Sequence, residues 1–192
     1  MIVVMISGKM GSGKTALADG LVDRLTDSGL KCYHTRFAKA LYEMHDAVLS
    51  VMRKYGHEIT LDKTLLQILG TQYGRNIVGQ DVWVNCFKSE IKKISEFSKV
   101  DVVLVSDMRF INEYHAISDA IKVRLEAHET VRKVRCSQWR ENTQHQSEID
   151  LDGYAAEGKF DLTLNTEVLD KEQTLNTVME YINERLSKGS GA

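Results

Sequence analysis

The stretch "ISGKMGSGKTALADG" (6–20) decides the fold of this chain. Residues 1–6 lead into it, are rich in Ile and Val, and have the composition of a buried parallel strand. A helix is expected after it, because apolar residues recur on one face until Gly29 ends the pattern. A strand, a glycine-rich turn and a helix are therefore predicted to follow one another at this end of the chain.

The turn reads GKMGSGKT (8–15) and fits the pattern GxxxxGK(S/T). Its glycines allow a tight bend with inward N–H groups, which form a cradle for anions with the start of the helix. Lys14 can reach the β- and γ-phosphates of a nucleoside triphosphate, and the Thr15 hydroxyl can bind Mg²⁺. At a glycine usage of about 7%, roughly one chain in a hundred of this length would match by chance. The residues expected to hold the phosphates of ATP are Gly8, Gly11, Ser12, Gly13, Lys14 and Thr15.

The composition is that of a single globular domain. The chain has 192 residues, of which 43% are hydrophobic and 27% charged. Its net charge of −2 argues against duplex nucleic acid as the main partner. No apolar stretch approaches the roughly 20 residues that span a membrane, and the three cysteines lie far apart, without metal-ligand spacing. We therefore expect a cytoplasmic protein with no membrane partner.

Strands and helices are expected to alternate along the rest of the chain. The further segments with the apolar character of strands are 31–38, 99–107, 121–127 and 160–165. The further segments with a helical apolar stripe are 39–55, a helix capped by Asp62, 81–97 and 171–187. This alternation predicts an α/β fold: a three-layer P-loop NTPase with a mostly parallel five-stranded sheet and helices on both faces. We expect one domain over 1–187 and a disordered tail over 188–192.

Asp107 ends the clearest strand and is the expected acid of the site. Ligands of α/β sheets lie at the carboxyl ends of strands, so Asp107 lies near the phosphates if its strand neighbours the first. It is expected to hold Mg²⁺ directly or through water; the alternative is a cap of the helix-like stretch that follows. Arg109, two residues later, suits a second phosphate, and the alternative for it is an ion pair with Glu113.

A polar, irregular segment over 128–158 contains RKVRCSQWR (132–140), with four cations and no acid. In a small kinase, a lid closes over the triphosphate at this position. Its arginines stabilise the charge of the moving phosphoryl group, and its closure excludes water. The candidates are Arg132, Arg135 and Arg140; the alternative is a solvated basic helix. A guanine-reading NKxD motif is missing, which excludes a switch GTPase.

Three further stretches, with the glycine loop, resemble one family. They are LQILGTQYGRNIVGQDVWVN (66–85), SDMRFINE (106–113) and HQSEIDLD (145–152). In this order they resemble the bacteriophage deoxynucleoside monophosphate kinases, over about residues 1 to 166. The resemblance implies transfer of the γ-phosphate of ATP to a deoxynucleoside monophosphate, giving the diphosphate and ADP. It also implies a monophosphate-binding insertion over about 37–97 and a lid over about 128–158.

The family's substrate residues are carried over by position. The resemblance makes Arg75 and Arg109 candidates for the monophosphate or the base, and Lys9 a candidate for the acceptor phosphate. Glu148 is expected to contact the substrate or to pair with a lid arginine. Phe37 begins the monophosphate-binding segment, although this chain reads FAKAL (37–41) where relatives often have an acid and a proline.

Lys14, Asp107 and the three lid arginines are therefore the expected catalytic residues, and Thr15 and Asp107 the expected metal ligands. The reaction needs no strong base, because a phosphomonoester oxygen is already an anion near neutral pH. His145 is expected to be structural, and Asn165 either lies near the adenine of ATP or forms a turn.

Two other functions stay open at this stage. The first is a kinase that phosphorylates a hydroxymethylated pyrimidine in DNA, for which Asp107 would be the base and a basic groove would hold the strand. The second is a nucleotide-binding protein without transfer activity. The expected partners are a (deoxy)nucleoside monophosphate, ATP and Mg²⁺, with nucleic acid only under the first alternative. The sequence leaves a homodimer open, and a phage origin would place the protein in the host cytoplasm.

Overall fold

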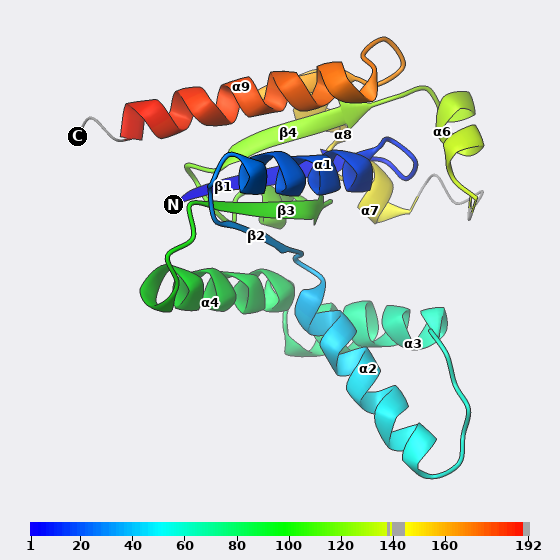
Figure 1. The fold of residues 1–192 in the computed structure, drawn as a ribbon. Helices are drawn as coiled ribbons and strands as arrows, with labels where there is room; N and C mark the ends of the chain where they lie inside the picture. The colour runs from blue at the N-terminus through cyan, green and yellow to red at the C-terminus, as the bar shows by residue number, and fades with distance from the viewer. Residues whose placement is uncertain (138, 140–144, 190–192) are drawn as a thin grey trace.

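The computed structural model describes residues 1–137, 139 and 145–189 (Figure 1). At its centre lies a five-stranded sheet in the order β2-β3-β1-β4-β5, and every neighbouring pair of strands is parallel. The strands are β1(Ile2–Gly8), β2(Cys32–Thr35), β3(Val102–Met108), β4(Ile121–Glu126) and β5(Leu162–Asn165). The predicted α/β fold with five strands is confirmed, and its sheet is parallel throughout the described residues.

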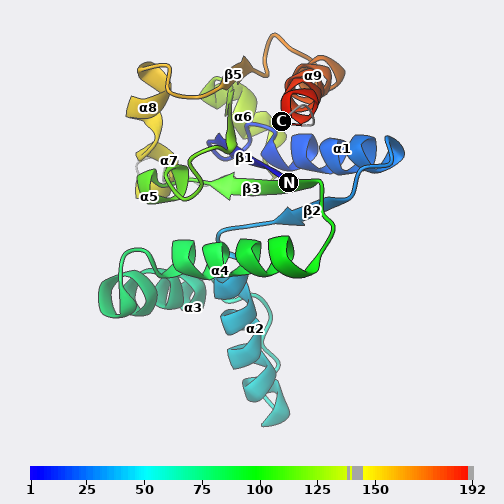
Figure 2. The ribbon, with the colours of Figure 1, turned by 90° about the vertical axis from the view of Figure 1, so that its left-hand side faces the viewer.

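Helices cover both faces of the sheet, which gives three layers (Figures 1 and 2). On one face, α1(Lys14–Asp27) and α9(Lys171–Gly189) pack on alternate β1 residues, Val4 and Ile6. On the other face, α4(Val82–Phe97) packs on Val3 and Met5. Since successive strand residues point to opposite faces, a central strand must be apolar at every position. This requirement explains the continuous apolar run at the start of the chain.

The ladder between β1 and β3 is irregular close to the glycine loop. Met5 pairs with Val105, but Ser7 pairs with Met108, so β3 has one residue more than β1 over this step. Ser106 and Asp107 together lie opposite the single residue Ile6, which is where the extra residue is accommodated. A bulge of this kind changes the direction of nearby side chains and is common next to functional sites.

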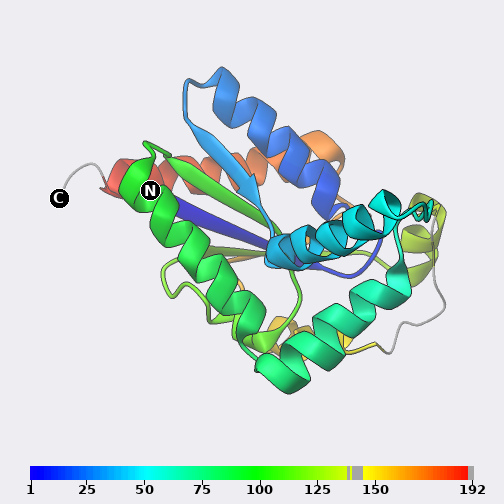
Figure 3. The same cartoon turned by 90° about the horizontal axis from the view of Figure 1, so that it is seen from below.

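An arm formed by α2(Lys39–Lys54), α3(Lys63–Gln67) and η1(Ile68–Val78) extends from the α4 side of the body (Figures 1 and 3). Asp62 caps α3 as predicted and accepts hydrogen bonds from the Thr64 and Leu65 N–H groups at 2.8 and 3.1 Å. The following element, η1, is a π-helix of 11 residues. Such helices are rare and are frequent at functional sites, and the sequence did not predict this one.

The described part of the segment 128–158, which was expected to be irregular, contains three short helices. They are α6(Glu129–Arg135), α7(Gln146–Ile149) and α8(Asp152–Ala156), and a fourth, α5(Ile111–Tyr114), follows β3. The closing helix α9 continues through Gly189, so the expectation of a tail from residue 188 is wrong at its first two positions. Residues 190–192 lie outside the described residues.

We predict that Gly74→Ala destabilises the protein. A Cβ atom at residue 74 would lie 2.6 Å from Cζ2 of Trp83 and 2.8 Å from the Leu69 carbonyl oxygen. The indole cannot easily move away, because its Nε1 donates to the Gly70 carbonyl at 2.9 Å. Overpacking of this kind usually costs about 1–3 kcal/mol, measurable as a lower free energy of unfolding in urea.

Gly153→Ala is the matched control. A Cβ atom at Gly153, in α8, meets no atom within 4 Å. The alanine should leave stability unchanged or raise it slightly, since alanine favours helix over glycine by up to about 1 kcal/mol. Equal losses in the two variants would contradict the packing argument.

Candidate active site

The glycine loop connects β1 to α1 at the carboxyl edge of the sheet, between β3 and β4. Gly11 has a φ of +79°, and a Cβ atom there would lie 2.5 Å from the carbonyl oxygen of Arg132. Only glycine allows this conformation together with so close an approach. The loop is therefore packed directly against the backbone of α6.

The N-terminus of α1 has the properties of an anion site. Gly13 precedes it, no side chain caps it, and its first turn contains no acid. The N–H groups of this turn lack intrahelical partners, and the helix dipole favours a negative charge. The exposed Thr15 hydroxyl lies in the same turn, and the buried Ser12 hydroxyl has no hydrogen-bond partner among the described residues. These groups fit a triphosphate, with Thr15 as one ligand of Mg²⁺.

The ammonium group of Lys14 lies within the glycine loop. It donates hydrogen bonds to the carbonyl oxygens of Gly8 at 2.6 Å and Lys9 at 2.9 Å. Burial and the positive charge of Arg109 lower the pKa of Lys14 from 10.5 to about 7. The negative charge of a phosphate would favour the protonated ammonium, so phosphate binding and Lys14 protonation support each other.

Asp107 is fully engaged with the start of α2. Its two carboxylate oxygens accept hydrogen bonds from the N–H groups of Phe37 at 2.8 Å and Ala38 at 3.1 Å. Burial raises the pKa of Asp107, while these two hydrogen bonds oppose the rise. Asp107 does not cap the helix that follows it, because the residue before α5 is Phe110. Its expected role as a metal ligand stays a prediction, and the carboxylate keeps lone pairs beyond the two bonds.

Arg109 pairs with Glu148 rather than with Glu113. Its guanidinium donates to one carboxylate oxygen of Glu148, and the other oxygen accepts from the N–H of Met10, in the glycine loop, at 2.8 Å. Burial acts to raise the pKa of Glu148, but the Met10 hydrogen bond and the Arg109 charge hold it below its usual value. The structure thus brings two predicted substrate residues together against the loop.

Arg75 reaches the same region from the π-helix. Its guanidinium lies 3.9 Å from the centre of the Phe110 ring and 3.5 Å from Oε1 of Glu113. The other carboxylate oxygen of Glu113 accepts from the N–H groups of Arg109 at 2.7 Å and Phe110 at 3.1 Å. Glu113 therefore places the Arg75 side chain beside the backbone that carries Arg109.

Lys9 belongs to a chain of charges that sequence reasoning missed. Its ammonium lies 2.6 Å from Asp152, whose other oxygen accepts from Arg124 at 2.7 Å. Arg124 is buried on β4, and it also donates to the Ser7 hydroxyl at 3.2 Å. The local pattern gave no signal for it, because a charged residue between two apolar ones, Val123 and Leu125, is typical of a strand with one face in solvent, whereas Arg124 is buried.

The two predicted lid arginines that the structure describes, Arg132 and Arg135, are hydrogen-bonded to other parts of the protein. Arg132 is buried and donates to the carbonyls of Ala127 and Met10, both at 3.0 Å. Arg135 donates to the hydroxyl and the carbonyl of Thr166, in the turn after β5. Arg140 lies outside the described residues. The expectation that these arginines stabilise the moving phosphoryl group stays a prediction.

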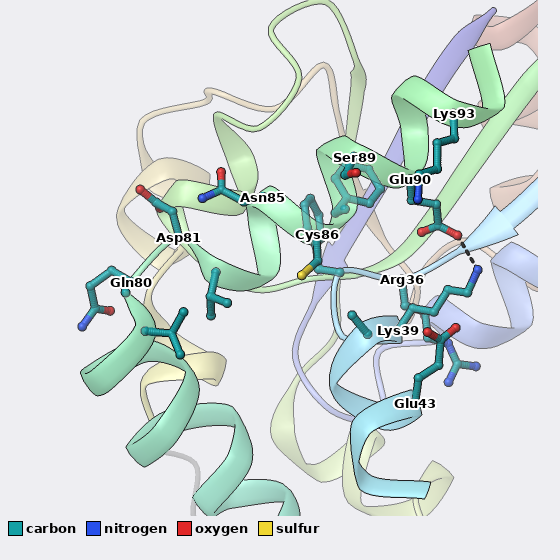
Figure 4. Close-up of a pocket in the computed structure, with 16 residues that line it drawn as sticks. Arg36, Lys39, Glu43, Gln80, Asp81, Asn85, Cys86, Ser89, Glu90 and Lys93 are labelled. Atoms are coloured by element: carbon teal, nitrogen blue, oxygen red, sulfur yellow. Dashed lines mark hydrogen bonds and ion pairs between the residues drawn. The ribbon is translucent and has the colours of Figure 1, made fainter. Parts of the chain in front are cut away.

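Phe37 is buried in the core rather than displayed in an open site. Only 2% of the residue is exposed, and its ring centre lies 4.3 Å from that of Phe87. Its edge lines a cavity of about 790 Å³ between α2 and α4 (Figure 4). In Figure 4, the ion pair of Lys39 with Glu90 lies on one side of this cavity and Asp81 on the other. Phe37 therefore forms part of the cavity wall, and most of its ring packs in the core.

A second cavity, of about 540 Å³, adjoins the glycine loop on the β4 side. Lys9 and Asn165 are among its lining residues. The Asn165 side chain accepts from the Glu167 N–H at 2.9 Å, which is a turn-forming contact. His145 caps α7 by accepting from the Ser147 N–H, so it has a structural role there.

No group of three or more His, Cys, Asp or Glu side chains in the described ranges is arranged to hold a metal ion. Over the same ranges, no helix combines the length and the apolar character required to cross a membrane.

Comparison with known proteins identifies the fold. No protein-family model matches the chain, and no curated protein matches it. A sugar kinase from Janibacter sp. HTCC2649 is similar in structure, with a TM-score of 0.54, 16% identity and 95% coverage of each chain. Shikimate kinase from Acinetobacter baumannii, in complex with shikimate, has a TM-score of 0.54 and 14% identity, with 96% of this chain and 94% of that chain covered.

The chain therefore has the P-loop α/β fold that these kinases share. Neither structure is described as a deoxynucleoside monophosphate kinase, so the resemblance to that family stays a prediction.

We predict that the stability of the protein falls as the pH rises from about 4.5 to about 7, because Glu113 ionises. Burial raises the pKa of Glu113 from 4.5 to about 7, so the folded chain binds this proton more tightly than the unfolded chain. The group is protonated in both states well below pH 4.5 and ionised in both above about 7, so its contribution falls across that window. At 1.36 kcal/mol per unit, the change amounts to about 3 kcal/mol.

Glu113→Gln tests this prediction through the free energy of unfolding in urea at pH 5 and pH 8. The glutamine oxygen can still accept the two N–H bonds and does not ionise. The variant should therefore gain stability relative to the wild type as the pH rises. Glu43→Gln, at an exposed site on α2, is the control, and its pH curve should follow that of the wild type. An identical course for Glu113→Gln would show that burial does not raise this pKa.

Proposed function

We propose that the protein is a P-loop kinase that transfers the γ-phosphate of ATP to a nucleoside monophosphate, giving the diphosphate and ADP. The proposal combines the phosphate-binding geometry of the glycine loop with the sequence resemblance to phage deoxynucleoside monophosphate kinases. Its fold, shared with two proteins named as kinases, supports phosphoryl transfer in general.

We choose a phosphate as the acceptor because the charged groups around Lys14 are already paired. The carboxylates of this region already accept two or more hydrogen bonds or ion pairs each: Asp107, Glu113, Glu148 and Asp152. Among the described residues, such a site offers cations for phosphate oxygens, while each of these carboxylates is already paired. A phosphate acceptor is already an anion and needs no base, whereas a hydroxyl acceptor would.

In this proposal the residues of the chain would have the following roles. The N–H groups from Gly11 to Thr15 and the Lys14 side chain hold the triphosphate, and Thr15 holds Mg²⁺. Arg75 and Arg109 bind and orient the acceptor phosphate, one of whose oxygens forms a bond to the γ-phosphorus. The bond from that phosphorus to the bridging oxygen of ADP breaks. ATP supplies the phosphoryl group, and in this scheme the protein contributes position and positive charge.

A hydroxyl acceptor is the second candidate. Two structural neighbours are named for a sugar and for shikimate, both of which carry hydroxyl groups. Asp107 is buried and has a raised pKa, which suits a base. This version includes a hydroxymethylated pyrimidine in DNA. A proton taken up by Asp107 would weaken its hydrogen bonds to the start of α2, so we favour the phosphate acceptor.

An assay of ADP release with ATP and Mg²⁺ tests the proposal. The acceptors are each deoxynucleoside monophosphate, each ribonucleotide, shikimate, simple sugars and a DNA that contains hydroxymethyluracil. Lys14→Met is the inactive control. Turnover on a free monophosphate supports the proposal, and turnover on a hydroxyl acceptor alone would replace it with the second candidate. ADP release at background level with every acceptor would indicate a binding protein without transfer activity.

Within this proposal, Arg75→Gln should weaken acceptor binding selectively. Loss of a charged hydrogen bond is worth about 1.5–3 kcal/mol, so the KM for the monophosphate should rise about 10- to 100-fold. The KM for ATP should stay within about twofold, because the loop that binds ATP is unaltered. Steady-state kinetics with each substrate varied in turn measures both values.

Arg185→Gln, on α9, is the control, since its side chain donates to the Asp119 carbonyl far from the loop. It should change neither KM. A rise in the KM for ATP alone in Arg75→Gln would place Arg75 on the donor side.

A further inference from the structure

The carboxylate of Glu148 makes the contacts with cationic and N–H groups that a substrate phosphate would make at this site. It accepts from the Met10 N–H at 2.8 Å and from the Arg109 guanidinium, and its charge acts on Lys14. Its side chain is 13% exposed, so the pair is largely desolvated and correspondingly strong. An internal anion therefore satisfies the cation that the proposed function assigns to the acceptor.

The neighbouring acids of the same segment have different partners. Asp150 accepts from the Ile111 N–H at 2.8 Å, and Asp152 bridges Lys9 and Arg124. These two contacts do not involve Arg109. They hold α7 and α8 to the body, so the segment remains anchored when the Glu148 carboxylate leaves its position.

We infer that the position of the Glu148 carboxylate is the binding position of the acceptor phosphate, and that the phosphate displaces Glu148 from Arg109 and Met10. This inference rests on the proposed function. A phosphomonoester carries almost two negative charges and three terminal oxygens, against one charge and two oxygens for a carboxylate. It therefore binds a guanidinium and a backbone N–H more strongly than the carboxylate does.

This arrangement makes Glu148 a competitor of the substrate instead of a ligand for it. The two roles predict opposite effects of removing its charge. If Glu148 competes, the neutral side chain lets phosphate bind more tightly. If Glu148 contacts the substrate directly, as the family resemblance implies, the neutral side chain weakens binding. As a competitor, Glu148 also selects against weakly charged acceptors, because only a strong anion displaces it.

The test is calorimetric binding of inorganic phosphate to wild-type protein and to Glu148→Gln. Saturating Mg²⁺ and a non-hydrolysable ATP analogue are present to fill the glycine loop. Glutamine keeps an acceptor for Met10 but loses the ion pair with Arg109, and an ionic hydrogen bond is roughly twice as strong as a neutral one. We expect Glu148→Gln to bind phosphate about tenfold more tightly, the effect of about 1.4 kcal/mol. Thermal unfolding of each variant verifies that it is folded.

Two further variants make the result specific to this position. Asp150→Asn is the matched control from the same segment and should bind phosphate within about twofold of the wild type, since its carboxylate accepts from the Ile111 N–H and not from Arg109. In the double variant Glu148→Gln with Arg109→Gln, the gain in affinity should disappear. Equal or weaker binding by Glu148→Gln, or a gain that persists without Arg109, would overturn the inference.

The binding test is independent of turnover. Tighter phosphate binding by Glu148→Gln without turnover on any monophosphate would retain the anion site and reject the proposed function. Turnover on a monophosphate with weaker binding by Glu148→Gln would retain the function and assign Glu148 as a substrate ligand.

Discussion

Pairing of buried charges determines the form of this site. A cation that leaves water must find a carboxylate or a backbone oxygen, because an unpaired buried charge is very costly. Arg124 and Arg132 are almost completely buried, and Arg75 and Arg109 are partly buried. Each has a partner from a distant part of the chain, so these pairings hold η1 and the segment after β4 against the sheet and the glycine loop.

Met10 shows how closely the loop depends on its surroundings. Its N–H donates to Glu148, and its carbonyl oxygen accepts from Arg132. Both partners belong to the segment predicted as a lid, on either side of residues 140–144. The shape of the loop that would receive the phosphates is thus held from two directions by the segment expected to cover it. A change in that segment would therefore be transmitted to phosphate binding without any contact to the nucleotide.

The sequence was sufficient for the fold and for the centre of the site because both depend on local patterns. Apolar runs of strand length, helical stripes and the GxxxxGK(S/T) spacing are each contained within a few residues. The resemblance added Glu148 and gave Arg75 and Arg109 their substrate roles, and the structure brings these three residues to one edge of the sheet. It could not give their partners, because the pairs of Arg109 with Glu148 and of Asp107 with the start of α2 join residues far apart in the chain. The π-helix escaped prediction because its pattern of apolar residues does not distinguish it from an α-helix.

The engagement of Asp107 with the start of α2 has a consequence for the chemistry. The two N–H groups that it accepts belong to the residues that join β2 to the arm. A proton on this carboxylate would weaken those hydrogen bonds and would loosen the arm at its base. A reaction that needed Asp107 as a base would weaken this connection in each cycle, whereas a phosphate acceptor lets it persist. Asp107 can therefore keep its hydrogen bonds to the start of α2 while a phosphate acceptor reacts. This compatibility links the fold to the proposed function.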